Sequence, residues 1–164
     1  MRSGTEMEGN DLMARAPFNV LIIPYMRVRA EVHFCIFKRS DTGIWQFVAG
    51  GGEDDERPPA AAARELEEET GIRSDKCMAL ASMCHIAANN FSEKVQTAWG
   101  KAVIVIPVHT FAVMCKANTH VCLSAEHTEY KWCHYDEARE RLHFDLDKTA
   151  LYELNVRISS NDSE

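Results

Sequence analysis

The segment Gly50–Ile72 constrains the fold of this chain more than any other part of the sequence. It opens with three consecutive glycines, continues through Pro58 and Pro59 and four alanines, and ends in a run of Glu and Arg that stops at Gly71. Proline in the first turn and glycine just after the last turn are typical signals of the two ends of a helix. The segment therefore predicts a flexible glycine loop that leads directly into a helix.

Three glutamates fall on one face of that helix. Glu65, Glu68 and Glu69 stand at positions i, i+3 and i+4, so their carboxylates project about one turn apart. Like charges at this spacing repel each other by roughly 0.2–0.5 kcal/mol. A solvated acidic face would explain the glutamates alone, but it leaves the glycine loop without a purpose. Clustered carboxylates also bind hard divalent cations such as Mg²⁺, which bridge to substrate phosphates and activate a water.

Strand-like runs and helical patterns alternate along the rest of the chain. Runs rich in Val, Ile and Phe predict strands over Phe18–Met26, Val32–Arg39, Trp45–Ala49, Cys77–His85, Lys101–Cys115, Val121–Leu123 and Tyr130–Cys133. Helical spacing predicts two closing helices, Asp136–Leu142 and Asp145–Arg157, the second with Leu146, Ala150, Leu151 and Leu154 on one stripe. This order of elements predicts an α/β (α+β) fold in which helices cover both faces of a sheet.

Length and composition favour a single soluble domain. A chain of 164 residues that is 46% hydrophobic can bury one core, expected over 17–158, with flexible tails at 1–16 and 159–164. A net charge of −7 with 26% charged residues argues against disorder and against binding to a nucleic acid polymer. The longest apolar stretch, Ala102–Val108, is interrupted by Pro107 and is too short to span a membrane.

The amino terminus and the cysteines indicate a cytoplasmic protein. The first sixteen residues carry both signs of charge and lack the apolar core of a secretory signal. The six cysteines include no CxxC pair, which argues against a zinc ribbon or a redox motif. Three of them fall in apolar runs, where a buried, reduced thiol is the simplest interpretation, and reduced thiols suit the cytosol.

Residues 50–72 resemble the Nudix box, G-x5-E-x7-R-E-U-x-E-E-x-G-U, in which U is a bulky aliphatic residue. The nine fixed positions of the box are all met, by Gly50, Glu56, Arg64, Glu65, Leu66, Glu68, Glu69, Gly71 and Ile72. With average residue usage, chance agreement at nine positions is on the order of 10⁻⁷ or less. The chain is therefore identified as a member of the Nudix family by this motif.

The resemblance implies a fold and a role for each matching residue. The implied fold is a mixed β-sheet sandwiched between helices, an α/β/α sandwich. Glu65, Glu68 and Glu69 correspond to the carboxylates that bind Mg²⁺, for which Mn²⁺ can substitute, and Glu65 is a candidate for orienting or deprotonating the attacking water. The positions with structural roles are Gly50, Glu56, Arg64 and Gly71, of which Glu56 and Arg64 correspond to a pair that braces the loop against the helix.

A second resemblance lies outside the box. Asp41–Val48 and Ser124–Trp132 look like segments of dihydroneopterin triphosphate pyrophosphatases and of related Nudix enzymes that hydrolyse dATP. In those proteins a loop glutamate opposite the box helix adds a further metal ligand or base. Glu126 takes that catalytic and metal-binding role by position, with Glu129 as the alternative and an ordinary loop glutamate as the simpler interpretation.

Five further residues are candidates for binding substrate. Lys38 and Arg39 end a strand just before the next turn, where a cation would hold a phosphate, although a solvated strand end fits equally well. Trp45, or its neighbour Phe47, would stack on a base or pterin ring unless it belongs to the core. Gly51, within the triple glycine, is the remaining candidate for contact with substrate.

Two parts of the sequence carry less information. The stretch between His85 and Lys101, with Phe91 and Trp99, follows no pattern of the family, and substrate choice is expected to depend on it. The seven histidines form no zinc-binding pattern; His127 is the one near the expected site, and we interpret it as part of the loop.

The resemblance implies hydrolysis of a phosphoanhydride bond. In the pyrophosphatase group, water attacks a phosphorus of a triphosphate and gives a monophosphate and pyrophosphate. The expected partner is a small nucleotide or pterin triphosphate of the dihydroneopterin triphosphate or dATP type, and homodimers are common in the family. Three alternatives stay open: hydrolysis of ADP-ribose or a dinucleoside polyphosphate, a non-catalytic Nudix-fold module that binds nucleotides in regulation, and an interaction protein that docks through the acidic helix.

Overall fold

The computed structural model describes residues 14–162, and its sheet is organised around the long strand β1 (Arg15–Val28). Most of the expected N-terminal tail, residues 1–13, lies outside the described residues, as do residues 163–164. Regular structure extends slightly beyond the expected domain at both ends, because β1 begins at Arg15 and the last helix continues to Asn161.

β1 pairs with three other strands. It runs parallel to β6 (Val105–Cys115) along most of its length, antiparallel to β4 (Val48–Glu53) in its first half, and antiparallel to β2 (Glu31–Arg39) in its second half. Pro24 lies where β1 leaves β4 and meets β2, a position at which the missing N–H costs the ladder little. The sheet contains both parallel and antiparallel pairs, which confirms the mixed sheet that the resemblance implies.

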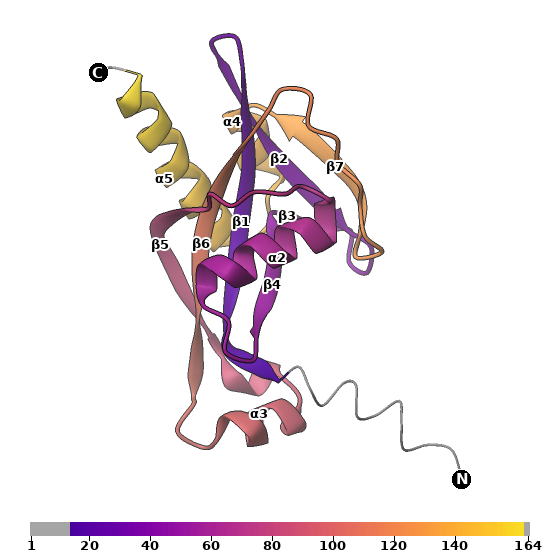
Figure 1. Ribbon diagram of the computed structural model, residues 1–164, viewed down its shortest axis with the longest axis vertical. Coiled ribbons are helices and arrows are strands. Elements are labelled where there is room, and N and C mark those ends of the chain that lie inside the picture. Colours follow the sequence, from indigo (N-terminus) through magenta and orange to yellow (C-terminus); the bar gives the residue numbers. More distant parts are fainter. Residues whose placement is uncertain (1–13, 163–164) are drawn as a thin grey trace.

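Three further strands extend the sheet from this centre. The main strand order is β3-β2-β1-β6-β5, with β4 paired to β1 and β7 paired to β2. The strands not yet given are β3 (Trp45–Gln46), β5 (Met78–Ala87) and β7 (His127–Cys133). The sheet therefore divides near the middle of β1, and the β2–β7 part bends away from the β5–β6 part (Figure 1).

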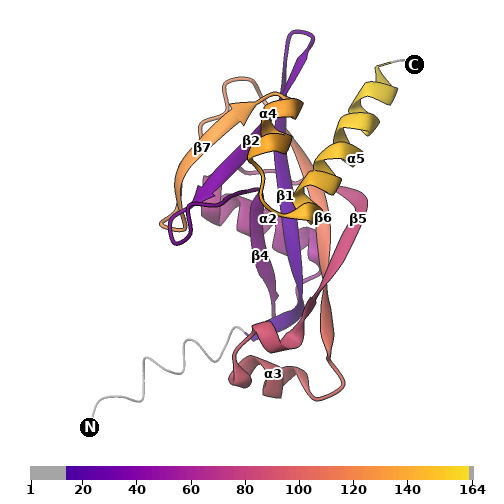
Figure 2. The ribbon, with the colours of Figure 1, turned by 180° about the vertical axis from the view of Figure 1, so that it is seen from behind.

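Helices cover both faces of this sheet, as the sequence predicts. α2 (Pro58–Thr70) lies across one face, and α4 (Tyr135–Arg141) and α5 (Asp145–Asn161) lie on the other face (Figure 2). α2 packs on β4 and β1, α5 on β5, and α4 on β2. Among the described residues, no helix has both the length and the apolar character needed to cross a membrane.

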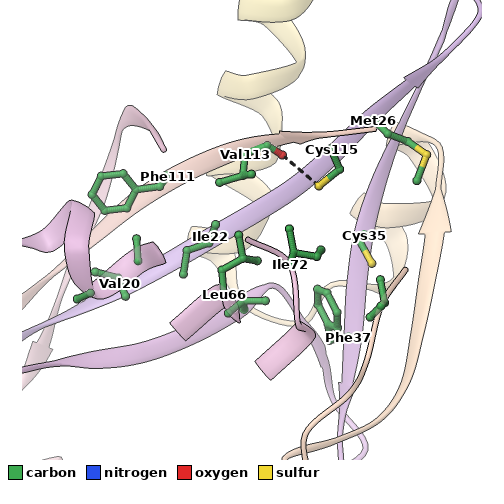
Figure 3. Close-up of a cluster of buried hydrophobic side chains, with 14 residues drawn as sticks. Val20, Ile22, Met26, Cys35, Phe37, Leu66, Ile72, Phe111, Val113 and Cys115 are labelled. Carbon is green, nitrogen blue, oxygen red and sulfur yellow. Dashed lines mark hydrogen bonds between the residues drawn. The ribbon is translucent and has the colours of Figure 1, made fainter. Parts of the chain in front are cut away.

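Two hydrophobic cores fill the spaces on the two sides of the sheet. On the α2 side, Leu66 and Ile72 pack against Ile22 and Phe37 (Figure 3). On the other side, α5 contributes the apolar stripe expected from the sequence: Ala150, Leu151 and Leu154 are buried, and Leu146 is partly buried against them. Ile158 extends the stripe by one more turn. α2 is held to the sheet by few apolar residues, so the rest of its inner face is free to carry carboxylates.

Two segments differ from the sequence-based expectation. A short helix, α3 (Glu93–Trp99), follows a 3₁₀ turn in the stretch without a recognised pattern; Ser92 caps it by accepting a hydrogen bond from the Val95 N–H at 3.3 Å. The strand expected over Val121–Leu123 is wrong. The N–H of Cys122 in that segment donates to the Thr70 carbonyl at 2.8 Å, so the segment satisfies the end of α2 and pairs with no described strand.

Candidate active site

The ends of α2 are set by its own sequence. Pro58 occupies the first turn, and Gly71 ends the helix in the left-handed conformation at φ 73°, where its N–H donates to the Glu67 carbonyl at 2.8 Å. Between these ends, Leu66 and Glu69 face the sheet and are buried, whereas Glu68 faces outward. The helix therefore directs Glu69 into the protein. Burying the ionised form of this carboxylate costs free energy.

The triple glycine belongs to strand β4 and is not a flexible loop, which corrects the sequence-based expectation. A Cβ atom at Gly50 would overlap the Glu65 carboxylate, and one at Gly51 would overlap the Arg15 guanidinium. The glycines are needed because side chains from α2 and β1 lie directly on the β4 backbone. Gly50 thus provides the space that holds Glu65 against the sheet.

Arg64 joins β4 to α2. Its Nε and Nη2 donate to the two carboxylate oxygens of Glu56, both at 2.9 Å, and Nη2 also donates to the Gly51 carbonyl at 2.7 Å. The hydrogen bonds from Arg64 hold the pKa of Glu56 below its usual range. Nη1 donates to Glu65 at 3.0 Å and to Glu68 at 3.2 Å. This geometry is the one that the resemblance implies for a bracing pair.

Three carboxylates converge at the buried end of this arrangement: Glu65 and Glu69 from α2 and Glu126 from the loop before β7. Burial raises the pKa of Glu69 to about 10, and the adjoining Glu126 and Glu65 carboxylates add to the rise. Burial also raises the pKa of Glu65. The Ser40 N–H fixes the loop by donating to the Glu126 carbonyl at 2.9 Å. Without a cation, the group cannot hold three negative charges at neutral pH.

The donor set fits a hard divalent cation. The side chain of Glu69 is only 5% exposed, and its Oε2 has no hydrogen-bond partner among the described residues. A buried, unpartnered carboxylate oxygen is costly unless a proton or a cation neutralises it. Mg²⁺ prefers oxygen ligands of this kind and keeps several waters. Glu68 lies at the edge of the group, with a side chain that is 57% exposed and paired with Arg64.

His127 is the first residue of β7 and lies beside Glu69, which corrects its interpretation as part of the loop. Its side chain is 1% exposed, and its Nδ1 lies 3.7 Å from Oε2 of Glu69, too far for a hydrogen bond. Neither ring nitrogen has a hydrogen-bond partner in the described part of the chain. Burial lowers the pKa of His127. The lowered pKa favours a neutral imidazole beside Glu69, in the lining of the cavity described next.

A cavity of about 430 Å³ opens beside the carboxylates, and we call it the polar cavity. It is lined by Arg39, Ser40, Asp41, Gln46, Ala49, Ala125, Glu126 and His127. Arg39 is held in place because Nε and Nη2 donate to the two Asp41 carboxylate oxygens at 2.8 and 2.7 Å. The structure thus brings a cation, Arg39, and a member of the carboxylate group, Glu126, to the lining of one cavity.

A second cavity of about 510 Å³ adjoins the first, and we call it the apolar cavity. The two share Arg39, Gln46 and Ala49. The remaining lining residues come from β1, β5, β6 and the start of α5: Asn19, Val20, Leu21, Cys84, Ile86, Val108, Phe144, Asp145, Leu146 and Asp147. Asp147 is buried and accepts a hydrogen bond from the Phe47 N–H at 2.8 Å; burial raises its pKa to about 7.

Trp45, Lys38 and Glu129 lie elsewhere. Trp45 and Glu129 line a third cavity of about 460 Å³, which shares no lining residue with the other two. Nζ of Lys38 pairs with Glu129 at 3.4 Å, and the Arg141 guanidinium lies 5.8 Å from the Trp45 ring centre. Of the candidate pairs from the sequence, Arg39 and Glu126 therefore reach the carboxylates, and Lys38 and Glu129 do not.

Comparison with known proteins decides the family. The model of the NUDIX domain matches residues 19–153. The chain belongs to the Nudix family. A solved structure from Listeria monocytogenes, described as a NUDIX hydrolase, is 40% identical, with a TM-score of 0.78 over 90% of this chain and 97% of that chain. A search of curated proteins found no match.

Two more distant structures share the Nudix fold. A C. elegans Ap4A hydrolase is 17% identical, with a TM-score of 0.68 over 88% of this chain and 99% of that chain. An E. coli dihydroneopterin triphosphate pyrophosphohydrolase is 19% identical, with a TM-score of 0.67 over 87% of this chain and 98% of that chain. The comparisons confirm the resemblance of the box and the fold that it implies. The chain is a Nudix hydrolase that acts on phosphoanhydrides.

Three residues of this Nudix site are not predicted from the sequence: Arg15, Gln46 and Asp147. His127 is expected near the site, but its burial beside Glu69 is not predicted. Arg15 was assigned to a tail, and no local pattern identifies it. Asp147 leaves a signal, because it is a carboxylate on the apolar stripe of α5, and a charged residue at such a position is rarely buried without a reason. Gln46 leaves a weaker signal, as a buried amide between two aromatic residues.

The stretch between His85 and Lys101, which has no family pattern, reaches the Nudix site in two ways. Nε1 of Trp99 donates to the Arg15 carbonyl at 2.6 Å, and the Arg15 guanidinium lies 5.3 Å from the centre of the Phe91 ring. From the same stretch, Ile86 lines the apolar cavity, whereas none of residues 88–100 lines the polar or the apolar cavity. The stretch therefore positions Arg15 beside Gly51 and contributes one side chain to the apolar cavity.

Proposed function

We propose that this Nudix hydrolase uses Mg²⁺, or Mn²⁺ in its place, to hydrolyse a triphosphate of the dihydroneopterin triphosphate or dATP type to a monophosphate and pyrophosphate. The observation that carries the proposal is the group of Glu65, Glu69 and Glu126, in which a buried carboxylate oxygen has no hydrogen-bond partner in the described chain. This group adjoins a cavity with one fixed arginine, which opens into an apolar cavity.

The carboxylates hold the metal and position the water. Glu65, Glu69 and Glu126 would hold the ion, with Glu68 able to join from the edge. Bound there, a divalent ion supplies neutralising charge for the phosphates and a more acidic water. Glu65 is placed to accept a proton from that water, because Gly50 and Arg64 fix its carboxylate and burial raises its pKa.

The polar cavity fits the polyphosphate. Arg39 has free donors beyond the two that bind Asp41, so it can hold a phosphate oxygen while Asp41 keeps its fork in place. His127 and Gln46 form a closed wall behind this position. Phosphoryl transfer depends mainly on such positioning and charge neutralisation.

The apolar cavity fits one planar ring. Its volume lies in the range of sites for small ligands, about 300–1,000 Å³. Phe144, which is partly exposed at the start of α5, offers a surface on which a ring can stack. Gln46 and Asp147 place an amide and a carboxyl at the edge of that ring. Since the pKa of Asp147 is about 7, its carboxyl can donate or accept a hydrogen bond near neutral pH.

A panel of substrates tests this assignment. Dihydroneopterin triphosphate and dATP should give kcat/KM values at least roughly tenfold above those of ADP-ribose and diadenosine tetraphosphate, about 1.4 kcal/mol in the transition state. Release of pyrophosphate, and not of orthophosphate, should accompany turnover. A higher value for ADP-ribose or the dinucleotide would keep the hydrolase and overturn the triphosphate assignment. Binding without turnover of any compound would favour a regulatory module.

We also propose a cytosolic location and a homodimer. The six cysteines are free thiols, and Cys35, Cys115 and Cys133 among them are buried, which suits a reducing compartment. The homodimer rests on family resemblance alone. Sedimentation equilibrium at micromolar concentration tests it, and a mass of one chain would reject it.

A further inference from the structure

A second cluster of metal-binding side chains lies at the other end of β2 from Arg39. Glu31 and His33 are two residues apart on β2 and so share one face of the sheet. His134 follows β7, and the pairing of Phe34 with Cys133 places it opposite His33. The cluster therefore joins the hairpin between β1 and β2 to the start of α4.

The three side chains face one another without hydrogen bonds. Oε2 of Glu31 lies 3.6 Å from Nε2 of His33 and 3.7 Å from Nε2 of His134. Both distances exceed those of a hydrogen bond. The two imidazole rings are 4.5 Å apart between centres, at an interplanar angle of 86°. One ligand atom from each residue lies within 4.8 Å of the other two.

His33 gives an independent reason to expect a ligand. Its Nε2 is shielded from solvent and has no hydrogen-bond partner within residues 14–162. A shielded, unpartnered nitrogen costs free energy unless something neutralises or binds it. Nε2 of His33 lies on the side of its ring that faces Oε2 of Glu31, 3.6 Å away.

We propose that Glu31, His33 and His134 bind one Zn²⁺ ion. Zn²⁺ bonds to histidine and carboxylate of about 2.0–2.2 Å place tetrahedral ligand atoms about 3.4 Å apart, close to the separations from Glu31. Two imidazoles and one carboxylate are a donor set for Zn²⁺, whereas Mg²⁺ prefers oxygen alone. The fourth position of the ion faces solvent, since Glu31 and His134 are largely exposed.

This ion would stabilise the fold and take no part in hydrolysis. His33 and Arg39 are six residues apart on one strand, which places the two sites about 20 Å from each other. The N-terminus of α4 has no side-chain cap, and His134 occupies its N-cap position. A bound ion would therefore hold the start of α4 to the β1–β2 hairpin.

Zinc binding in saturating Mg²⁺ tests the proposal, because Mg²⁺ occupies the acidic group of the active site. The wild-type protein should retain one Zn²⁺ per chain after dialysis, as measured by inductively coupled plasma mass spectrometry. His134→Ala and Glu31→Gln should each weaken binding by at least about 100-fold, the upper limit for loss of a mere second-shell contact. His120→Ala changes an exposed histidine outside the cluster and should bind as wild type.

Thermal unfolding with and without Zn²⁺ distinguishes a loss of zinc binding from a defect in folding. Zn²⁺ should raise the Tm of wild type and of His120→Ala but not of His134→Ala, while all three should have similar Tm values without metal. The same measurements in a Glu69→Gln background should give the same differences. If wild type retains no Zn²⁺, or if Glu69→Gln abolishes binding and His134→Ala does not, the proposed site is wrong.

Discussion

The polar and apolar cavities share three lining residues, yet they are assembled in different ways. The carboxylates beside the polar cavity come from one continuous segment, Gly50–Glu69, together with a single loop that contributes Glu126. The apolar cavity takes its lining from β1, β5, β6 and α5, which are far apart in sequence. The carboxylates are thus encoded locally, whereas the cavity that we propose for the ring depends on tertiary packing. Variants in one cavity should affect turnover, and variants in the other should affect substrate choice and stability.

The largest effect is expected from Glu69→Gln. The change keeps the size and helix propensity of the side chain but removes a ligand charge, so the rate should fall by roughly 10²–10⁴-fold. The metal-free protein should have an equal or higher Tm, because a buried acid with a raised pKa is removed. Steady-state kinetics and thermal unfolding in EDTA measure both effects.

The matched control for that prediction is Glu129→Gln. Glu129 lies on β7, three residues after Glu126, but it lines the third cavity and pairs with Lys38. The turnover of Glu129→Gln should stay within about twofold of wild type, because the loss of an exposed ion pair has little effect. Equal losses of turnover in the two variants would mean that the overall negative charge of this region, and not the buried carboxylate group, supports activity.

Asp147→Asn should change how stability depends on pH. The folded pKa of Asp147 is about 7, against 3.8 in the unfolded chain, so the folded state binds the proton more tightly. The contribution of Asp147 to the free energy of unfolding is therefore greatest below about pH 4. A part on the order of 2–4 kcal/mol is lost as the pH rises to about 7. Asn keeps an acceptor for the Phe47 N–H but does not ionise. The variant should therefore lose this dependence of stability on pH. Urea unfolding between pH 4 and 8 measures it, and an unchanged slope would contradict the assignment.

Arg39→Gln should have a smaller effect on catalysis. Loss of the cation that faces the phosphates should lower kcat/KM roughly tenfold, mainly through a higher KM, about 1.4 kcal/mol. Lys38→Gln is the matched control, since Lys38 precedes Arg39 on β2 but pairs with Glu129, which lines the third cavity. Kinetics with the same triphosphate should show near wild-type values for Lys38→Gln. The reverse order of effects would place the phosphates outside the polar cavity.

The smallest effect is expected from Trp45→Phe. Trp45 lines neither the polar nor the apolar cavity and packs near Arg141. The substitution keeps an aromatic ring, so KM and kcat should change by less than about twofold. A tenfold rise in KM would show that Trp45 stacks on the substrate, as its place in the sequence suggests, and would weaken the role given to Phe144.

The sequence predicts the parts of this molecule that depend on local rules. Pro58 and Gly71 mark the ends of α2, and the spacing of Glu65 and Glu69 places both on its inner face. The glycines were interpreted as a flexible loop because glycine is most often found in turns. In the folded protein, Gly50 is required by close packing against Glu65, a contact that only tertiary structure creates.

The residues that the sequence does not predict act through long-range contacts. Arg15 reaches the site because β1 pairs with β4, and it is fixed by Trp99, which lies 84 positions later. Gln46 and Asp147 come together because α5 packs on the sheet beside β3. No local sequence pattern predicts such pairs. The box therefore predicts the reaction class, while the shape of the apolar cavity depends on the assembled fold.

Metal dependence of pyrophosphate release tests the central claim most directly. The protein is stripped with EDTA, and the rate with dihydroneopterin triphosphate is followed as Mg²⁺ is added back. Because Glu65, Glu69 and Glu126 cannot all be ionised without a cation, hydrolysis should be absent in EDTA and return in full with Mg²⁺ or Mn²⁺. Full activity after exhaustive chelation would contradict the claim that these three carboxylates form a metal-dependent active site.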